Sequence, residues 1–230
     1  MSGWKISPEK SPDGTGRDAM SRPFCFSQMS NDPTVPEAWL SAGAPPLEVD
    51  FGCHRGTFLL GMAGGFPLRN FLGIERQSAR VERCNARILR LGLANALAIR
   101  GEGPGALGDL LPAASVGILH VSFPDPWPKR RHAWRRLVTG GFLAAAARVL
   151  RPDGTLRLMT DDPDYFTGMQ CLTAEGWREV AWNDGIERPA TAFEKTFLAL
   201  GKRPFRLALQ PLQSRRSKSR AWNLRIEQPS

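Results

Sequence analysis

Short apolar segments alternate with amphipathic ones along the chain from Pro45 onward. Apolar runs bounded by Gly, Pro and polar residues are typical of buried strands, and we expect strands at residues 47–51, 70–74, 96–99, 116–121 and 155–159. Between them, apolar residues recur at helical spacing, which predicts helices at residues 59–63, 78–91 and 142–150. This alternation indicates an α/β fold with a Rossmann-like, doubly wound sheet.

Both ends of the chain depart from this pattern. Residues 1–44 are rich in Ser, Pro, Gly and Asp with little periodicity, which predicts a mobile N-terminal arm. Residues 205–209 and 221–226 are further apolar segments, and we expect them to close the sheet as a C-terminal antiparallel hairpin. Residues 45–230 then form one domain.

A glycine-containing turn follows the first predicted strand. Asp50, Gly52 and Gly56 lie where that strand passes into a helix, and glycines at such a turn let the backbone approach a ligand closely. Glu75 ends the next strand about 20 residues later, the spacing at which Rossmann-like folds present a carboxylate to ribose hydroxyls. The pyrophosphate fingerprint Gly-x-Gly-x-x-Gly is absent, which favours a ligand such as S-adenosylmethionine.

The stretch from Phe123 to His132 reads Phe-Pro-Asp-Pro-Trp-Pro-Lys-Arg-Arg-His and follows the fourth predicted strand. Open α/β sheets bind ligands at the carboxyl ends of their strands, so this loop is a candidate site. Each proline restricts its own φ and the residue before it, which predicts a rigid, extended backbone at Asp125 and Trp127. An indole and a basic cluster beside the carboxylate exceed what a simple turn requires.

The chain has 31 Lys and Arg against 22 Asp and Glu, a formal net charge of +9. This excess favours a polyanionic partner, and nucleic acid is the first candidate. No apolar stretch approaches the roughly 20 residues of a membrane span and no signal core is present, so we expect a cytoplasmic protein. The 4 cysteines and 3 histidines show no zinc-binding spacing, which predicts reduced thiols and no metal.

These motifs resemble one family, the bacterial tRNA (guanine-N7)-methyltransferases, which modify guanine 46 of the tRNA variable loop. The resemblance covers roughly residues 47–194, and Phe-Pro-Asp-Pro-Trp-Pro-Lys is its most specific element. Two later segments are similar to the family's Thr-Asp-x-x-x-Tyr-x-x-x-Met and Thr-Lys-Phe-Glu motifs; they begin at Thr160 and Thr191. The resemblance implies a sheet of the S-adenosylmethionine-dependent methyltransferase type, that cofactor, and tRNA as partner.

The resemblance also implies roles for individual residues. The cofactor-contacting acids fall on Asp50, Glu75, Glu102 and Asp125, joined by the loop glycines Gly52 and Gly56. The substrate-binding positions fall on Lys129, Asp161, Thr191, Phe193 and Glu194. Of the two adjacent acids, Asp161 and Asp162, one is expected to cap the helix before Tyr165.

Three positions depart from the family pattern. Glu102 stands where the family has Asp, and Ala192 replaces a Lys. His54 stands where the family has a glycine, so an imidazole lies beside the expected cofactor site. We expect Gly52 and Gly56 on either side to supply the backbone freedom that accommodates His54.

Guanine N7 has a free lone pair and carries no proton, so methylation at N7 requires positioning and no strong general base. We therefore assign Asp125 as the catalytic acceptor that holds the guanine edge, and Trp127 as either a stacking surface or a core residue. The basic side chains from Lys129 to Arg136 are interpreted as phosphate contacts, with a solvated basic face as the alternative.

Two other functions remain open at this point. A similar loop occurs, by resemblance, in methyltransferases that act on exocyclic amines of nucleobases. A catalytically silent RNA-binding relative is the other, because of His54 and Ala192. The sequence leaves the oligomeric state open between monomer and homodimer.

Overall fold

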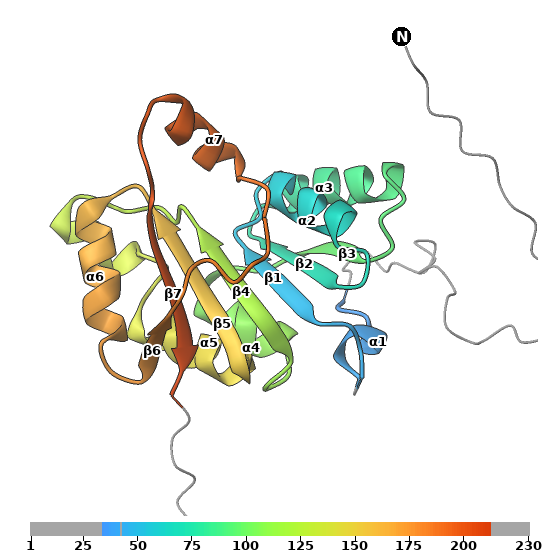
Figure 1. Ribbon diagram of the computed structural model, residues 1–230, viewed down its shortest axis with the longest axis horizontal. Coiled ribbons are helices and arrows are strands. Elements are labelled where there is room, and N and C mark those ends of the chain that lie inside the picture. Colours follow the sequence, from blue (N-terminus) through green and yellow to red (C-terminus); the bar gives the residue numbers. More distant parts are fainter. Residues whose placement is uncertain (1–33, 42, 213–230) are drawn as a thin grey trace, which may run out of the picture.

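The computed structural model describes residues 34–41 and 43–212, which form a seven-stranded sheet with helices on both faces (Figure 1). The strand order is β3-β2-β1-β4-β5-β7-β6. The first five strands are parallel and confirm the strands expected from the sequence: β1 (Leu47–Phe51), β2 (Asn70–Glu75), β3 (Ala96–Arg100), β4 (Val116–Ser122) and β5 (Leu150–Thr160). The order reverses between β1 and β4, which is the switch point where such sheets bind ligands.

A helix follows each of the five parallel strands, and a short polar side chain caps the first turn of two of these helices. They are α2 (Thr57–Gly65), α3 (Ser78–Arg90), α4 (Gly103–Leu110), α5 (Gly140–Val149) and α6 (Pro163–Thr173). Thr139 accepts a hydrogen bond from the Phe142 amide at 3.2 Å, and Asp162 accepts one from the Tyr165 amide at 2.7 Å. These caps satisfy amides that lack partners within the first helical turn, so the cap predicted before Tyr165 is confirmed for Asp162.

The sequence pattern did not indicate α4. This helix contains three glycines, which lower helix propensity, and it forms because Ala106 and Leu107 are buried against the sheet. In residues 34–41 and 43–212, no helix is both long and apolar enough to cross a membrane.

Two hydrophobic cores lie on opposite faces of the sheet. Successive side chains of a strand point to opposite faces, so Leu72 and Ile74 join the core with α4, α5 and α6, whereas Phe71 joins the core with α2 and α3. Among residues 34–41 and 43–212, the apolar cluster on the second face includes residues of β2 and β3 but none of β4 or β5. Over β4 and β5 the same face carries His120 and Arg157, both buried. That polar half faces the chain segment between β6 and α7.

The sheet ends in antiparallel strands, as expected. The strand that contains residues 205–209 pairs with other strands than the one predicted. β7 (Phe205–Pro211) pairs antiparallel with β5 and with β6 (Trp177–Val180). The predicted partner, residues 221–226, lies outside the described residues. Sequence analysis missed β6 because this strand is short and its exposed residues Arg178 and Glu179 interrupt the apolar pattern.

The chain before β1 contributes to the folded domain. A short helix, α1 (Glu37–Leu40), places Trp39 against the larger core, where its side chain is 9% exposed. Most of the predicted mobile arm, residues 1–33 and 42, lies outside the described residues. The buried Trp39 shows that at least part of the segment assigned to that arm packs on the domain.

Asn85 of α3 completes the hydrogen bonding of the edge strand β3. Its side-chain amide donates to the Ala98 carbonyl at 2.8 Å, and its side-chain oxygen accepts from the Ala98 amide at 2.9 Å. Asn85 and Ala98 are both buried, so neither backbone group has water as an alternative partner.

We therefore expect Asn85→Ala to lower the free energy of unfolding by about 2–3 kcal/mol, because it leaves a buried N–H and a buried C=O unpaired. Urea unfolding followed by circular dichroism measures the change. Glu82→Ala, an exposed position on the same helix, is the control and should stay within about 0.5 kcal/mol of the wild type. Equal stability of the two variants would contradict this role.

Candidate active site at the carboxyl ends of the strands

The turn after β1 has a left-handed backbone at three positions. The φ angles are +86° at Gly52, +53° at His54 and +71° at Gly56. A side chain at Gly52 would project into open space, and one at Gly56 would overlap the Cys84 sulfur. His54 therefore adopts a conformation that suits glycine, at a cost of about 1 kcal/mol or more.

Glu75 holds this turn from the end of β2. Its carboxylate accepts hydrogen bonds from the His54 amide at 3.1 Å and from the Gln77 amide at 3.0 Å, and Arg80 lies 3.5 Å away. The side chain is 5% exposed. The predicted site residue Glu75 thus fixes the backbone of the turn in which His54 lies.

Asp50 lies at the end of β1 and is buried, with 6% of its surface exposed. Burial, and secondarily the negative charge of Glu75, raise the pKa of Asp50 to about 7. A cation bound beside both carboxylates would favour their ionised forms. Glu102 lies farther out, after β3; its side chain is 72% exposed and 3.7 Å from Arg76. The structure therefore groups Asp50 with Glu75 and leaves Glu102 at the rim.

The loop after β4 is held in an unusual conformation. Phe123 has φ of +53° and Trp127 has φ of +43°, so two residues other than glycine with left-handed backbone flank Asp125. The prediction of an extended backbone at Trp127 was wrong: the prolines restrict the loop, but they do not decide the sign of φ at Trp127. Such strain persists only where the surrounding structure imposes it, and it is concentrated at functional sites.

Arg136 and Tyr165 impose the conformation of this loop. The Arg136 Nε donates to the Pro126 carbonyl at 2.8 Å, and its guanidinium lies 4.8 Å from the centre of the Tyr165 ring. The Tyr165 hydroxyl, which is buried, accepts from the Val138 amide at 3.0 Å. Arg136, interpreted from sequence as a phosphate contact, is therefore used inside the protein to hold the loop.

The neighbouring side chains face outward. Asp125 and Lys129 are exposed, and Trp127 is half-buried, so it does not belong to either core. Arg135, in the 3-10 helix η2 (Arg130–Arg135), lies 4.9 Å from the Trp127 ring and 5.0 Å from the ring of Trp134, which is 75% exposed. A basic and aromatic surface therefore borders Asp125.

The helix α7 (Ala192–Ala199) brings the third motif to this edge. Thr191 and Glu194 form a capping box, in which each side chain accepts a hydrogen bond from the other's amide, and Arg206 lies 2.5 Å from the Glu194 carboxylate. These predicted substrate-binding residues thus fix the start of α7. Phe193 lies between them and is 56% exposed.

Phe193 joins the two loops described above. Its ring centre lies 6.0 Å from that of Phe123 and 6.5 Å from that of His54. Residues that are far apart in the sequence therefore meet at one edge of the sheet, beside Asp125. Asp161, exposed after β5, belongs to the same edge. Residues 34–41 and 43–212 contain no group of three His, Cys, Asp or Glu side chains arranged to hold a metal.

A group of buried charges that sequence analysis did not identify lies beneath the segment that leads into α7. Glu48, in the middle of β1, is 1% exposed and contacts Arg69 at 2.5 Å, His120 at 2.9 Å and Arg188 at 3.9 Å. Arg188 also binds Asp184 through two hydrogen bonds of 2.7 and 2.8 Å. The detectable signal was an acid at position 48 and a histidine at position 120, each within a mostly apolar strand.

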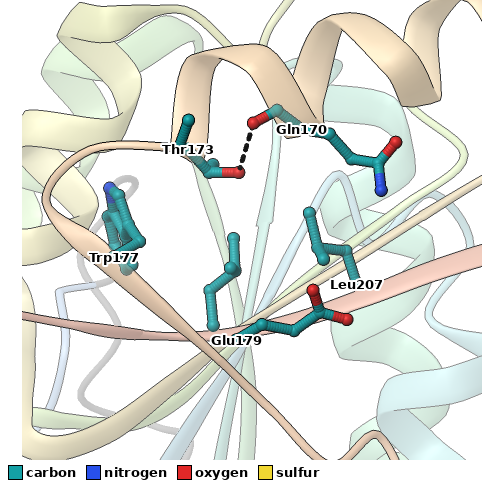
Figure 2. A pocket seen from close by; sticks show the side chains of 7 residues that line it. Gln170, Thr173, Trp177, Glu179 and Leu207 are labelled. Carbon is teal, nitrogen blue, oxygen red and sulfur yellow. Dashed lines mark hydrogen bonds between the residues drawn. The ribbon is translucent and has the colours of Figure 1, made fainter.

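A separate hollow of about 200 Å³ lies between α6 and the β6–β7 pair. Figure 2 shows Gln170 and Thr173 above it, Trp177 and Leu207 on either side, and Glu179 below. Leu209, which also lines it, pairs with Leu156 near the start of the regular part of β5. This hollow is therefore remote from the carboxyl ends of the parallel strands.

Comparison with known proteins agrees with this geometry. A family model described as "Putative methyltransferase" matches residues 44–207. The tRNA (guanine-N(7)-)-methyltransferase of Levilactobacillus brevis is 35% identical over 164 residues, which cover 68% of this chain and 76% of the relative. The chain belongs to the tRNA (guanine-N(7)-)-methyltransferase family. The enzyme of that name from Leifsonia xyli is 38% identical over 174 residues, covering 73% of this chain and 77% of the relative.

Solved structures confirm the fold of this family member. A SAM-dependent methyltransferase from Aquifex aeolicus has a TM-score of 0.52 at 17% identity, over 74% of this chain and 85% of that one. The antibiotic-resistance methyltransferase Kmr has a TM-score of 0.53 at 24% identity, over 77% of this chain and 92% of that one. The fold expected from the sequence, a sheet of the methyltransferase type, is confirmed.

The raised pKa of Asp50 predicts a pH-dependent effect on stability. The carboxyl is protonated in the folded protein up to about pH 7 but ionises near pH 4 when unfolded, so the wild type loses stability as the pH rises from 4 through 7. We expect Asp50→Asn to stabilise the fold by roughly 2–4 kcal/mol at pH 8 and much less at pH 5.

Urea unfolding at both pH values measures this difference. Asp109→Asn, an exposed carboxylate on α4, is the matched control and should show no such dependence. A stability difference between Asp50→Asn and the wild type that is the same at pH 5 and pH 8 would show that Asp50 is ionised in the folded protein throughout.

Proposed function

We propose that this protein transfers a methyl group from S-adenosylmethionine to N7 of a guanine in tRNA. The observation that carries the proposal is the meeting of three elements at one edge of the sheet: the turn after β1, the strained loop with Asp125, and the start of α7. They meet in a chain whose relatives bear the name of that activity. The resemblance noted from the sequence points to guanine 46 as the position.

The first turn offers features that fit S-adenosylmethionine. The space beside Gly52 is open, and Gly56 allows the close turn into α2. Asp50 and Glu75 place two buried carboxylates together, and a ligand with a sulfonium and an ammonium group supplies the positive charge that they lack. We assign cofactor binding to these four residues with Glu102 and Asp125 at the rim. The cofactor supplies an electrophilic methyl group; the protein supplies its orientation.

Asp125 is the catalytic residue in this proposal. Its exposed carboxylate accepts hydrogen bonds from guanine N1–H and the exocyclic amine, and this orientation turns N7 towards the methyl group. Adenine offers no matching pair of donors at that edge, so the same contact selects guanine. Because N7 carries no proton, the main contribution of the site is orientation, which Arg136 and Tyr165 secure by holding the loop.

The remaining predicted residues divide into two groups. Lys129 and Phe193 are exposed, and we assign Lys129 to RNA phosphate and Phe193 to contact with the base or ribose. Thr191 and Glu194 position α7 through the capping box and the ion pair with Arg206, and thereby position Phe193. We assign Asp161 to the substrate side of the same edge. We place the activity in the cytoplasm, where tRNA is available.

A tRNA that carries 7-deazaguanine at the target position is expected to accept no methyl group, because the attacking nitrogen is replaced by carbon. Transfer of labelled methyl from S-adenosylmethionine to unmodified and deaza tRNA measures this. Undiminished labelling of the deaza tRNA would exclude N7 and favour an exocyclic amine. Absence of labelling with both substrates, while tRNA still binds, would favour a silent RNA-binding relative.

Asp125→Asn keeps the shape of the side chain but replaces one acceptor oxygen by a donor. We expect kcat/KM for tRNA to fall by about tenfold or more, whereas the Kd for S-adenosylmethionine changes by a few-fold. Steady-state kinetics and calorimetry measure the two quantities. Asp109→Asn, far from this edge on α4, is the control with the same change of charge. An Asp125→Asn protein with wild-type kcat/KM would exclude this role for Asp125.

A further inference from the structure

A polar cavity of about 300 Å³ lies beneath the segment that leads into α7. Its walls come from β4, β5 and β7 on the sheet side and from residues 182–194 on the other, with Phe58 of α2 at one end. Three arginines line it, Arg157, Arg188 and Arg206, together with Trp182 and His120. Thr191 and Glu194 border both the cavity and the start of α7, so the cavity lies next to the proposed active site.

Arg157 lacks the partners that a buried arginine normally has. Its side chain is 5% exposed, and within the described residues its guanidinium makes no hydrogen bond. The nearest carboxylate oxygen, on Asp184, is 3.6 Å away, beyond hydrogen-bond distance. The guanidinium lies 4.0 Å from the centre of the Trp182 ring, which provides a flat surface but no acceptor.

The other two arginines are paired, so Arg157 is the exception. Arg188 binds Asp184 through both terminal nitrogens, and Arg206 binds Glu194. Burial, with the nearby charge of Arg188, lowers the pKa of Arg157 to about 10, and burial keeps His120 neutral by lowering its pKa. The ion pairs in and around the cavity therefore join four arginines to three carboxylates. The arginines are Arg69, Arg157, Arg188 and Arg206, and the carboxylates are Glu48, Asp184 and Glu194.

A structural role alone does not account for Arg157. Removal of a guanidinium from water is costly unless hydrogen bonds replace the lost ones, and an apolar side chain of similar volume would fill the position on β5 at lower cost. To satisfy Arg157, a ligand in the cavity would have to supply acceptor oxygens and one negative charge. A phosphodiester supplies both, and its two free oxygens match the fork of the guanidinium.

We propose that this cavity is a phosphate-binding site, and that the phosphate belongs to the backbone of the RNA substrate next to the target nucleotide. The proposal rests on the proposed function for the identity of the RNA, and on Arg157 for the chemistry. Free inorganic phosphate has the same chemistry, so the experiment must distinguish the two sources.

The first arm of the experiment uses the wild-type protein and inorganic phosphate. Trp182 lies against Arg157 and 5.5 Å from Arg206, so phosphate binding is expected to change its fluorescence saturably at millimolar concentration. Potassium chloride at equal ionic strength is the control for screening. The chain has 7 tryptophans, and the signal is assigned to Trp182 by its loss in Trp182→Phe. This arm requires no arginine variant and no methyl transfer.

The second arm measures tRNA binding without cofactor by fluorescence anisotropy. Arg157→Met keeps the length of the side chain and removes the charge; we expect the Kd for tRNA to rise about tenfold or more. The salt dependence of binding should weaken by roughly one counterion. The Kd for S-adenosylmethionine should not change. Arg178→Met is the matched control, because Arg178 is exposed on β6 and hydrogen-bonded to Gln210 at 2.6 Å; its tRNA affinity should equal that of the wild type.

The outcomes separate cleanly. Weaker tRNA binding by Arg157→Met but not by Arg178→Met supports an RNA phosphate. Saturable phosphate binding with unchanged tRNA affinity in Arg157→Met overturns the RNA source. No phosphate signal and unchanged tRNA affinity overturn the site altogether. Wild-type protein that binds tRNA through Arg157 but fails to methylate N7 would contradict the proposed function and leave the phosphate site in place.

Discussion

Glu48 lies in the middle of the sheet, and a carboxylate in that position must be neutralised because an unpaired buried charge costs several kcal/mol. Arg69 and Arg188 neutralise it, and the neutral imidazole of His120 gives it a hydrogen-bond partner. These three groups come from separate parts of the chain: Arg69 precedes β2, His120 lies in β4, and Arg188 precedes α7. Electrostatic pairing at Glu48 therefore fixes the segment before α7 on the sheet. Together with the ion pair between Arg206 of β7 and Glu194, that attachment supports the position of Phe193 beside Phe123 and His54.

A series of contacts leads from the buried charges around Glu48 to the proposed guanine site. Arg188 is fixed by Glu48 and Asp184, the segment continues to the capping box of Thr191, and α7 then presents Phe193 to the two loops. The loop with Asp125 is held from the opposite side by Arg136 and Tyr165. Each side of the proposed guanine site is thus supported by buried polar contacts, which hold geometry better than exposed ones because they exclude water.

Sequence reasoning succeeded where the signal was local. The parallel strands follow from apolar runs, and both loops follow from glycine or proline spacing next to a strand. Asp50, Glu75 and Asp125 could therefore be placed at the carboxyl ends of strands from the sequence, and their roles stay predictions. It failed where contacts join distant residues. Arg136 looked like any other member of a basic cluster, and only its bond to the Pro126 carbonyl reveals its role. Arg157 gave no signal, because its surroundings come from four separate elements.

The amide of Asn85 has a consequence for encounters between copies of the protein. An edge strand normally presents free N–H and C=O groups to which another chain can add a strand, and this is a route to aggregation. At β3, the N–H and C=O groups of Ala98 are already hydrogen-bonded to the side chain of Asn85. At the opposite edge, β6 has four residues, two of them charged and exposed, Arg178 and Glu179. Both edge strands are therefore poor templates for strand addition. This opposes aggregation of a chain whose largely parallel sheet forms slowly during folding.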